Sequence, residues 1–238
     1  MIRFFIVFII IIFQFEYAST QDTTAVKSSK VKTGYITGGA LIVTGLILNK
    51  ESIKTDVREW VRDRYDIPNT SVDDILQHVP IAMIYATDLA LGNDKKEIGR
   101  HTRHLIVSQA MTLGTMLITK EITNSPRPND GSHTFPSGHT AYSFASAGVM
   151  YHSFKDDNLW LAYSGYVPAA VVGVYRVIKD KHWVSDVVVG AGLGIVMSHL
   201  SYHMDIWHSR TDKRDKGHTS VNVRLGMTPA GLGLSATF

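Results

Sequence analysis

The chain has 238 residues, enough for one domain with a substantial core, and it is 45% hydrophobic and 19% charged. Its net charge is +3, and the basic residues form no block of the kind that a nucleic-acid-binding arm needs, so no nucleic acid partner is expected. The chain has no cysteine, which excludes disulfides, thiolate metal sites and a cysteine nucleophile.

The N-terminus has the layout of a secretory signal peptide. Arg3 precedes an unbroken apolar run over residues 4–13, and small or polar residues such as Ala18 and Ser19 follow it. The run is too short to span a bilayer, which takes about 20 residues. We therefore predict a signal peptide over residues 1–19, with an uncleaved anchor as the alternative, and we place this segment outside the fold.

The central part of the chain predicts an all-α fold. A polar linker is expected over residues 20–33 and the folded domain over residues 34–205. A short amphipathic helix is expected near residues 57–65, ending before Pro68. Six apolar segments with helical character make up the bundle, at residues 33–49, 79–92, 104–122, 140–152, 159–179 and 184–203.

The C-terminal tail, residues 206–238, has a different pattern. Its last part, "SVNVRLGMTPAGLGLSATF", alternates apolar and polar residues around a Pro-Ala-Gly break. Alternation with a turn signal is typical of strands, so the tail favours a short β-hairpin, with a frayed end as the alternative.

Several cations fall at or beside predicted helix ends. Lys120 ends the third apolar segment, Arg127 lies in the loop after it, and Arg176 lies near the end of the fifth segment. Arginine offers a planar fork that suits phosphate oxygens, and lysine adds a point charge. Ser137 and Gly138 lead into the fourth segment, where free backbone N–H groups and the helix dipole favour an anion. These residues predict a site for a group with several negative oxygens.

Two histidines and one aspartate complete the pattern. Asp186 follows His182 by four residues, so both side chains lie on one face of a starting helix. A carboxylate that binds one ring nitrogen makes the other nitrogen a better nucleophile, and His139 is free to act as an acid. Together with the cations, these residues predict a phosphoryl-transfer site.

The remaining histidines have no such neighbours. His101, His104, His133 and His152 are expected to be ordinary non-catalytic side chains, most often at the surface. Asp88 interrupts the apolar stretch "MIYATDLALG", and a buried carboxylate there needs a partner that the sequence does not identify.

The spacing Lys-x6-Arg-Pro, then Pro-Ser-Gly-His, then Arg-x5-His-x3-Asp resembles the signature of the type 2 phosphatidic acid phosphatase (PAP2) family. The superfamily also contains bacterial class A acid phosphatases and vanadium haloperoxidases. Because three separated motifs occur in order, the resemblance is specific, and it extends from about the second apolar segment to the sixth. It implies a six-helix bundle of the PAP2/haloperoxidase type.

The resemblance also implies roles for the matching residues. His182 attacks phosphorus and forms a phosphohistidine, Asp186 orients His182, and His139 protonates the leaving oxygen. The phosphate oxygens are held by Lys120, Arg127, Ser137, Gly138 and Arg176. No metal and no cofactor are implied, and vanadate is expected to inhibit. Tyr175 stands where the family usually has serine, which is expected to cost a supporting contact rather than activity.

The function implied is hydrolysis of a phosphomonoester or pyrophosphate, with a lipid phosphate as the substrate class and the membrane as a partner. The alternatives are a periplasmic non-specific acid phosphatase for soluble esters, a vanadium-dependent haloperoxidase and a non-catalytic envelope protein. Several apolar segments are shorter than the about 20 residues of a full span. We therefore expect a membrane-associated bundle of the bacterial cell envelope with its site facing the periplasm, and a soluble periplasmic domain is the alternative.

Overall fold

The structure is a computed structural model that describes residues 26–67, 70–129, 131–132 and 134–204, together with two strands near the C-terminus. Side chains are described from Gly34 to Met204, apart from the gaps. The chain forms two units, Met1–Met204 and Asp205–Phe238, which divide next to the predicted boundary between residues 205 and 206. The predicted signal peptide, residues 1–19, lies outside the described residues.

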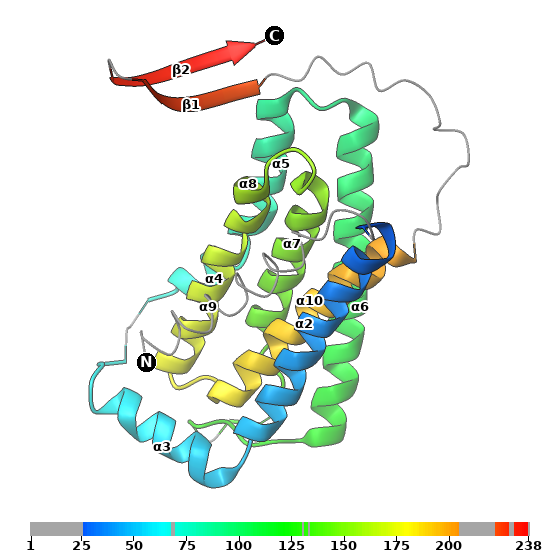
Figure 1. Cartoon of the computed structure of the whole chain (residues 1–238). Helices are drawn as coiled ribbons and strands as arrows, with labels where there is room; N and C mark the ends of the chain where they lie inside the picture. The colour runs from blue at the N-terminus through cyan, green and yellow to red at the C-terminus, as the bar shows by residue number, and fades with distance from the viewer. Residues whose placement is uncertain are drawn as a thin grey trace. The chain divides into compact units, whose positions relative to one another are not determined.

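The first unit is entirely helical where it is described, which confirms the predicted all-α class. Figure 1 shows its long helices running alongside one another, with α3 across one end. The helices are α2 (Val26–Leu48), α3 (Glu51–Arg62), α4 (Val72–Leu76), α5 (Val79–Leu91), α6 (Lys95–Thr123), α7 (Gly138–Phe154), α8 (Leu159–Ser164), α9 (Tyr166–Ile178) and α10 (Val184–His203).

Several helix boundaries differ from the predicted ones, among them α3, which covers Glu51–Arg62 instead of residues 57–65. α2 begins at Val26, so the linker predicted over residues 20–33 is wrong for residues 26–33, which contain no proline or glycine to stop a helix. α6 begins well before residue 104, because the Asp94 carboxylate accepts hydrogen bonds from the backbone N–H groups of Lys96 and Glu97, both at 2.9 Å. The five-residue helix α4 was not predicted.

The fifth apolar segment forms two helices, α8 and α9, which meet at Gly165. A Cβ atom at Gly165 would lie 2.9 Å from the Met150 sulfur and 3.4 Å from the Ala147 Cα atom. A larger residue would therefore push this junction away from α7.

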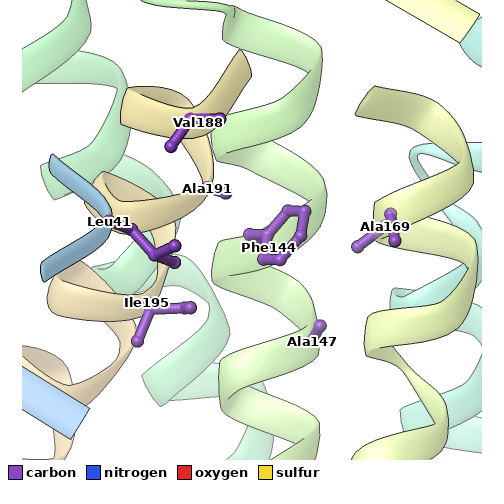
Figure 2. Close-up of a cluster of buried hydrophobic side chains, with 8 residues drawn as sticks. Leu41, Phe144, Ala147, Ala169, Val188, Ala191 and Ile195 are labelled. Carbon is purple, nitrogen blue, oxygen red and sulfur yellow. The ribbon is translucent and has the colours of Figure 1, made fainter. Parts of the chain in front are cut away.

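The core is built around α10, which packs chiefly against α2 and α7. Figure 2 shows Phe144 of α7 between Ala191 of α10 and Ala169 of α9. The contact between α7 and α10 is close, since a Cβ atom at Gly194 would overlap the Ala141 carbonyl oxygen. Small residues thus let the two helices that carry the predicted catalytic residues meet along their backbones.

Asp88 has the partners that a buried carboxylate requires. His101 Nδ1 lies 2.8 Å from Asp88 Oδ1, and the Asn93 side-chain amide donates to the same oxygen at 2.7 Å. The expectation that His101 and His104 lie at the surface is wrong, because α6 turns both into the bundle. His104 instead stacks on Tyr202, with ring centroids 3.7 Å apart.

The outer surface of the bundle exposes large apolar side chains on α2 and α6. Those on α2 are Ile36, Val43, Leu46 and Ile47, and those on α6 are Ile106, Leu113, Leu117, Ile118 and Ile122. All are more than half exposed. In addition, Leu159–Ile178, which covers α8 and α9, and α10 are long and apolar enough to cross a membrane, although most of α10 is buried inside the bundle. Many exposed large apolar side chains on an outer surface indicate a contact with lipid or with another protein.

The second unit contains an antiparallel hairpin of β1 (Asn222–Thr228) and β2 (Gly231–Thr237). Its register pairs Asn222 with Thr237 and Thr228 with Gly231. The predicted C-terminal hairpin is therefore confirmed.

Candidate active site

The predicted site residues gather at the end of the bundle that α3 crosses (Figure 1). The C-terminal ends of α6 and α9 meet there with the beginning of α10, and the loop after α6 leads back into α7. The Ser137 backbone N–H donates to the Asp186 carbonyl oxygen at 3.0 Å, so the starts of α7 and α10 are joined directly. Residues that are far apart in the sequence, such as Ser137 and Asp186, thus lie close together at this end of the bundle.

His182 lies in the loop between α9 and α10 and is only 3% exposed. Its Nδ1 lies 3.1 Å from the Thr134 hydroxyl and 3.5 Å from Asp186 Oδ2. The Thr134 hydroxyl donates a short hydrogen bond to Asp186 Oδ2, so it must accept from His182. This relay places the ring hydrogen on Nδ1 and leaves a lone pair on Nε2.

Burial lowers the pKa of His182 to about 4, more strongly than the nearby Asp186 carboxylate raises it. The positive charges of Arg176 and Lys120 lower this pKa further. His182 is therefore neutral near pH 7, which a nucleophilic imidazole requires.

Asp186 is held at the first turn of α10 and is 1% exposed. Besides the Thr134 hydroxyl, the Trp183 backbone N–H donates to Asp186 Oδ2 at 3.0 Å. The predicted role of Asp186 as the residue that orients His182 fits this arrangement, with Thr134 between the two side chains.

His139 lies in the first turn of α7, and its side chain is 30% exposed. Its Nε2 lies 2.8 Å from Asp74 Oδ1 on α4. Burial and the charge of Arg176 lower the pKa of His139, while Asp74 and the more distant Asp73 oppose them.

Arg176 is buried on α9 and donates from Nη1 to Asp73 Oδ2 at 2.8 Å. Its Nε is also buried, and no hydrogen-bond partner for it occurs within the described part of the chain. Lys120 Nζ lies 3.4 Å from the Thr134 carbonyl oxygen, and Arg127 Nε donates to the Ser132 carbonyl oxygen at 3.1 Å. Burial and the charge of Arg127 lower the pKa of Lys120.

These cations lie within electrostatic reach of one another and of His182. The charges of Arg127 and Arg176 lower the pKa of Lys120, and the charge of Asp186 raises it. The charges of Arg176 and Lys120 lower the pKa of His182. Three like charges converging beside a neutral imidazole are stabilised by a bound anion with several oxygens.

The start of α7 faces the same region with its backbone N–H groups. The hydroxyl of Ser137, the residue before α7, pairs with the Thr140 hydroxyl at 2.9 Å instead of capping the helix. A Cβ atom at Gly138 would lie 2.8 Å from the terminal carbon of Met116, so glycine lets this turn pack against α6. A helix N-terminus without a side-chain cap is suited to an anion.

Residues of α3 support the loop that carries His182. Asp180 has a left-handed backbone with φ of 56°, and Arg58 binds its carboxylate with two hydrogen bonds of 2.8 and 2.6 Å. Arg62 adds a third at 3.0 Å. The Trp183 indole N–H donates to the Pro126 carbonyl oxygen at 3.0 Å. The loop is therefore fixed from both sides of His182.

Sequence reasoning missed Thr134, Asp73, Asp74 and Lys179. Thr134 lies in the loop between the third and fourth predicted segments, and Asp73 and Asp74 lie outside every motif identified in the sequence. Their contacts with His182, Arg176 and His139 join remote parts of the chain, so no local spacing could reveal them. Tyr175 lies next to Arg176 on α9, and the effect of this residue stays a prediction. His133 is outside the described residues.

Among the residues that the structure describes, no three His, Asp or Glu side chains are grouped in a way that could hold a metal ion. The candidate groups for binding an anion are instead the cations and the start of α7.

The sequence profile described as the PAP2 superfamily matches residues 102–210, a range that includes all the predicted site residues. This range, a little under half of the chain, is similar to the PAP2 superfamily. The fold of the chain is similar to that of a transmembrane PAP2-type phosphatidylglycerolphosphate phosphatase from Bacillus subtilis, with a TM-score of 0.56 and 18% identity. That match covers 74% of this chain and 98% of the other, and it supports the predicted PAP2-type helical fold.

Two characterised proteins are similar in sequence. A lipid A 1-phosphatase from Porphyromonas gingivalis is 29% identical over 159 residues, which are 66% of this chain and 34% of that protein. Diacylglycerol pyrophosphate phosphatase 1 from Saccharomyces cerevisiae is 30% identical over 108 residues, which are 40% of this chain and 37% of that protein. The matched region is thus about a third of the length of each of these relatives.

Proposed function

We propose that this chain is a metal-independent phosphatase that hydrolyses a phosphomonoester or pyrophosphate of a lipid through a phosphohistidine on His182. The observation that carries the proposal is the buried, neutral His182, whose Nδ1 is held by Thr134 and whose surroundings contain Lys120 and Arg176. The similar proteins described above are named as phosphatases of lipid phosphates, which supports a lipid as the substrate class.

The reaction follows from the geometry in two steps. Nε2 of His182 attacks phosphorus while the bond to the leaving oxygen breaks and His139 gives that oxygen a proton. Neutral His139 then takes a proton from water, which attacks the phosphohistidine and releases phosphate. Lys120, Arg127 and Arg176 stabilise the negative charge on the transferred phosphoryl oxygens in both steps.

We further propose that the bundle is membrane-associated, with the site at the periplasmic face of a bacterial envelope. The exposed apolar side chains of α2 and α6 support this, since they offer a lipid-facing surface around a site for a lipid headgroup. A soluble periplasmic enzyme is the second candidate, because the partly exposed His139 leaves the site accessible to a small ester.

The test is phosphate release by the purified chain in detergent. We expect hydrolysis of lipid phosphates without added metal, inhibition by vanadate, and a loss of turnover on the order of 10³-fold or more in His182→Ala. The panel contains lipid A, phosphatidylglycerophosphate, diacylglycerol pyrophosphate and soluble esters, so that it also separates the two candidates. Unchanged turnover in His182→Ala would contradict the mechanism, and halide oxidation with vanadate in place of hydrolysis would point to a haloperoxidase.

A further inference from the structure

Helix α4 places two adjacent carboxylates against the predicted active site. Asp73 is fully buried and binds Arg176 at 2.8 Å and Lys179 at 2.7 Å. Lys179 also donates to the Thr70 carbonyl oxygen at 2.6 Å, just before α4. These bonds fix α4 to the end of α9.

Asp74 has a different environment from Asp73. Its side chain is 49% exposed, and its strongest contact is the 2.8 Å hydrogen bond with His139 Nε2. Its other charged neighbour is Arg176, whose Nη1 lies 3.9 Å away. Asp74 therefore faces the histidine that the mechanism uses as an acid, and a change at Asp74 disturbs little of the buried structure.

His139 needs such a partner because its other surroundings disfavour the protonated form. The charged groups that face it are Arg176 from α9 and the two aspartates of α4. Burial and Arg176 both favour the neutral ring, whereas a general acid must carry a proton before it can donate one. The Asp74 carboxylate is the charged group in direct contact with the ring that opposes them.

We propose that Asp74 is a positioning residue that holds the His139 ring and stabilises its imidazolium form for protonation of the leaving oxygen. The inference rests on the proposed phosphatase function. Asp74 accepts the hydrogen of Nε2, which leaves Nδ1 as the nitrogen that donates. When the bond between phosphorus and the leaving oxygen breaks, the Nδ1 proton moves to that oxygen, and the neutral ring keeps its Nε2 hydrogen on Asp74.

The experiment compares Asp74→Asn with the unaltered chain on two esters between about pH 5 and pH 9. Benzyl phosphate releases a poor leaving group that needs the proton, and 4-nitrophenyl phosphate releases one that does not. We expect kcat for benzyl phosphate to fall about tenfold at neutral pH, with its decline at high pH beginning at a lower pH. Turnover of 4-nitrophenyl phosphate should change less than about twofold, because its leaving group needs little assistance.

Two further variants test whether the effect on benzyl phosphate depends on a negative charge at position 74. Asp74→Glu keeps the charge and should recover most of the rate on benzyl phosphate. Glu97→Gln removes one acidic charge from a partly exposed ion pair with Arg100 at the start of α6, so it should leave both substrates and the pH profile unchanged. Thermal melts of all variants show whether each is folded, and Asp74→Ser replaces Asp74→Asn if the latter is not.

Two outcomes would overturn the positioning role of Asp74, and a third would overturn the proposed phosphatase function. An equal loss on both esters with an unmoved pH profile would mean a merely structural role and would overturn the proposal. A higher kcat/KM of Asp74→Asn on both esters at every pH would mean that Asp74 competes with substrate, and would overturn it as well. If the unaltered chain hydrolyses neither ester nor any lipid phosphate, the proposed function itself fails.

Discussion

Within the described residues, two pairs of histidine and aspartate are buried in the bundle. Their comparison shows what distinguishes a candidate active site from a structural contact. His182 and Asp186 lie where α9 meets α10, and His101 and Asp88 join α6 to α5. The four side chains are between 1% and 3% exposed, so burial does not separate the pairs.

The pairs differ in what surrounds them. His101 contacts Asp88 directly at 2.8 Å and packs edge-on against Phe154, with ring centroids 5.2 Å apart. His182 reaches Asp186 through the Thr134 hydroxyl and lies in the field of Lys120 and Arg176. An imidazole beside a carboxylate is therefore common to both, whereas converging cations and an uncapped helix start occur beside His182. We infer that the anion-binding surroundings, and not the pair, define the site.

The largest expected effect is a loss of kcat on substitution of Asp186, which the same substitution of Asp88 should not cause. In Asp186→Ala, the Thr134 hydroxyl loses its acceptor and turns to donate to His182 Nδ1, which moves the ring hydrogen to Nε2 and blocks attack. We expect kcat to fall on the order of 10³- to 10⁴-fold, as for other enzymes in which the wrong tautomer is stabilised. Turnover of 4-nitrophenyl phosphate in single-turnover and steady-state assays measures this.

The matched change in the other pair is Asp88→Ala. It removes the contacts with His101 and Asn93 and should lower the free energy of unfolding by about 1–3 kcal/mol, measured by urea titration. Its kcat should stay within about twofold of the unaltered chain. A comparable loss of kcat in both variants would show that the surroundings of His182 do not distinguish it from His101.

The sequence was most informative where catalytic chemistry has a local spacing. Lys120, Ser137 and Asp186 were placed at predicted helix ends from the sequence, and the structure brings these helix ends together. The roles assigned to these residues stay proposals, although the structure brings the side chains to the same end.

The contacts made by packing were not predictable from spacing. Thr134 lies 48 residues from His182, and Asp74 lies 65 residues from His139. Which side chains meet over such separations depends on how helices cross, and this is set by small residues such as Gly194 along α10. For the same reason, the sequence left Asp88 without a partner and placed His101 at the surface.

A smaller effect is expected from Thr134→Val, which keeps the shape of the side chain but removes the hydroxyl. Asp186 Oδ2 and His182 Nδ1 each lose a partner, which should cost about 1–3 kcal/mol and lower kcat about 10- to 100-fold. Thr134→Ser should retain most of the rate. The control is Thr102→Val near the other pair, where the hydroxyl lies 3.1 Å from the Tyr85 hydroxyl and where kcat should not change.

The smallest expected effect is on the pH dependence of kcat/KM, which should reflect protonation of His182 but not of His101. Because the folded pKa of His182 is lowered to about 4, kcat/KM should stay insensitive to this group near neutral pH and fall only as pH drops through about 4, where the ring becomes protonated. Burial also lowers the pKa of His101, although the charge of Asp88 raises it. Protonation of His101 should cause no additional change in kcat/KM.

Both groups should instead contribute to stability with the same sign. For each histidine the unfolded chain binds more protons than the folded chain below its ordinary pKa of about 6.5. Stability from either ring is therefore fully present above that pH and is lost as pH falls through the lowered folded value. Thermal melts and kcat/KM measured over the same acidic range distinguish the loss of stability from the loss of activity. As pH falls, the melting temperature should decline before kcat/KM does. A decline of kcat/KM that begins near pH 6.5 or above would contradict a buried, neutral His182.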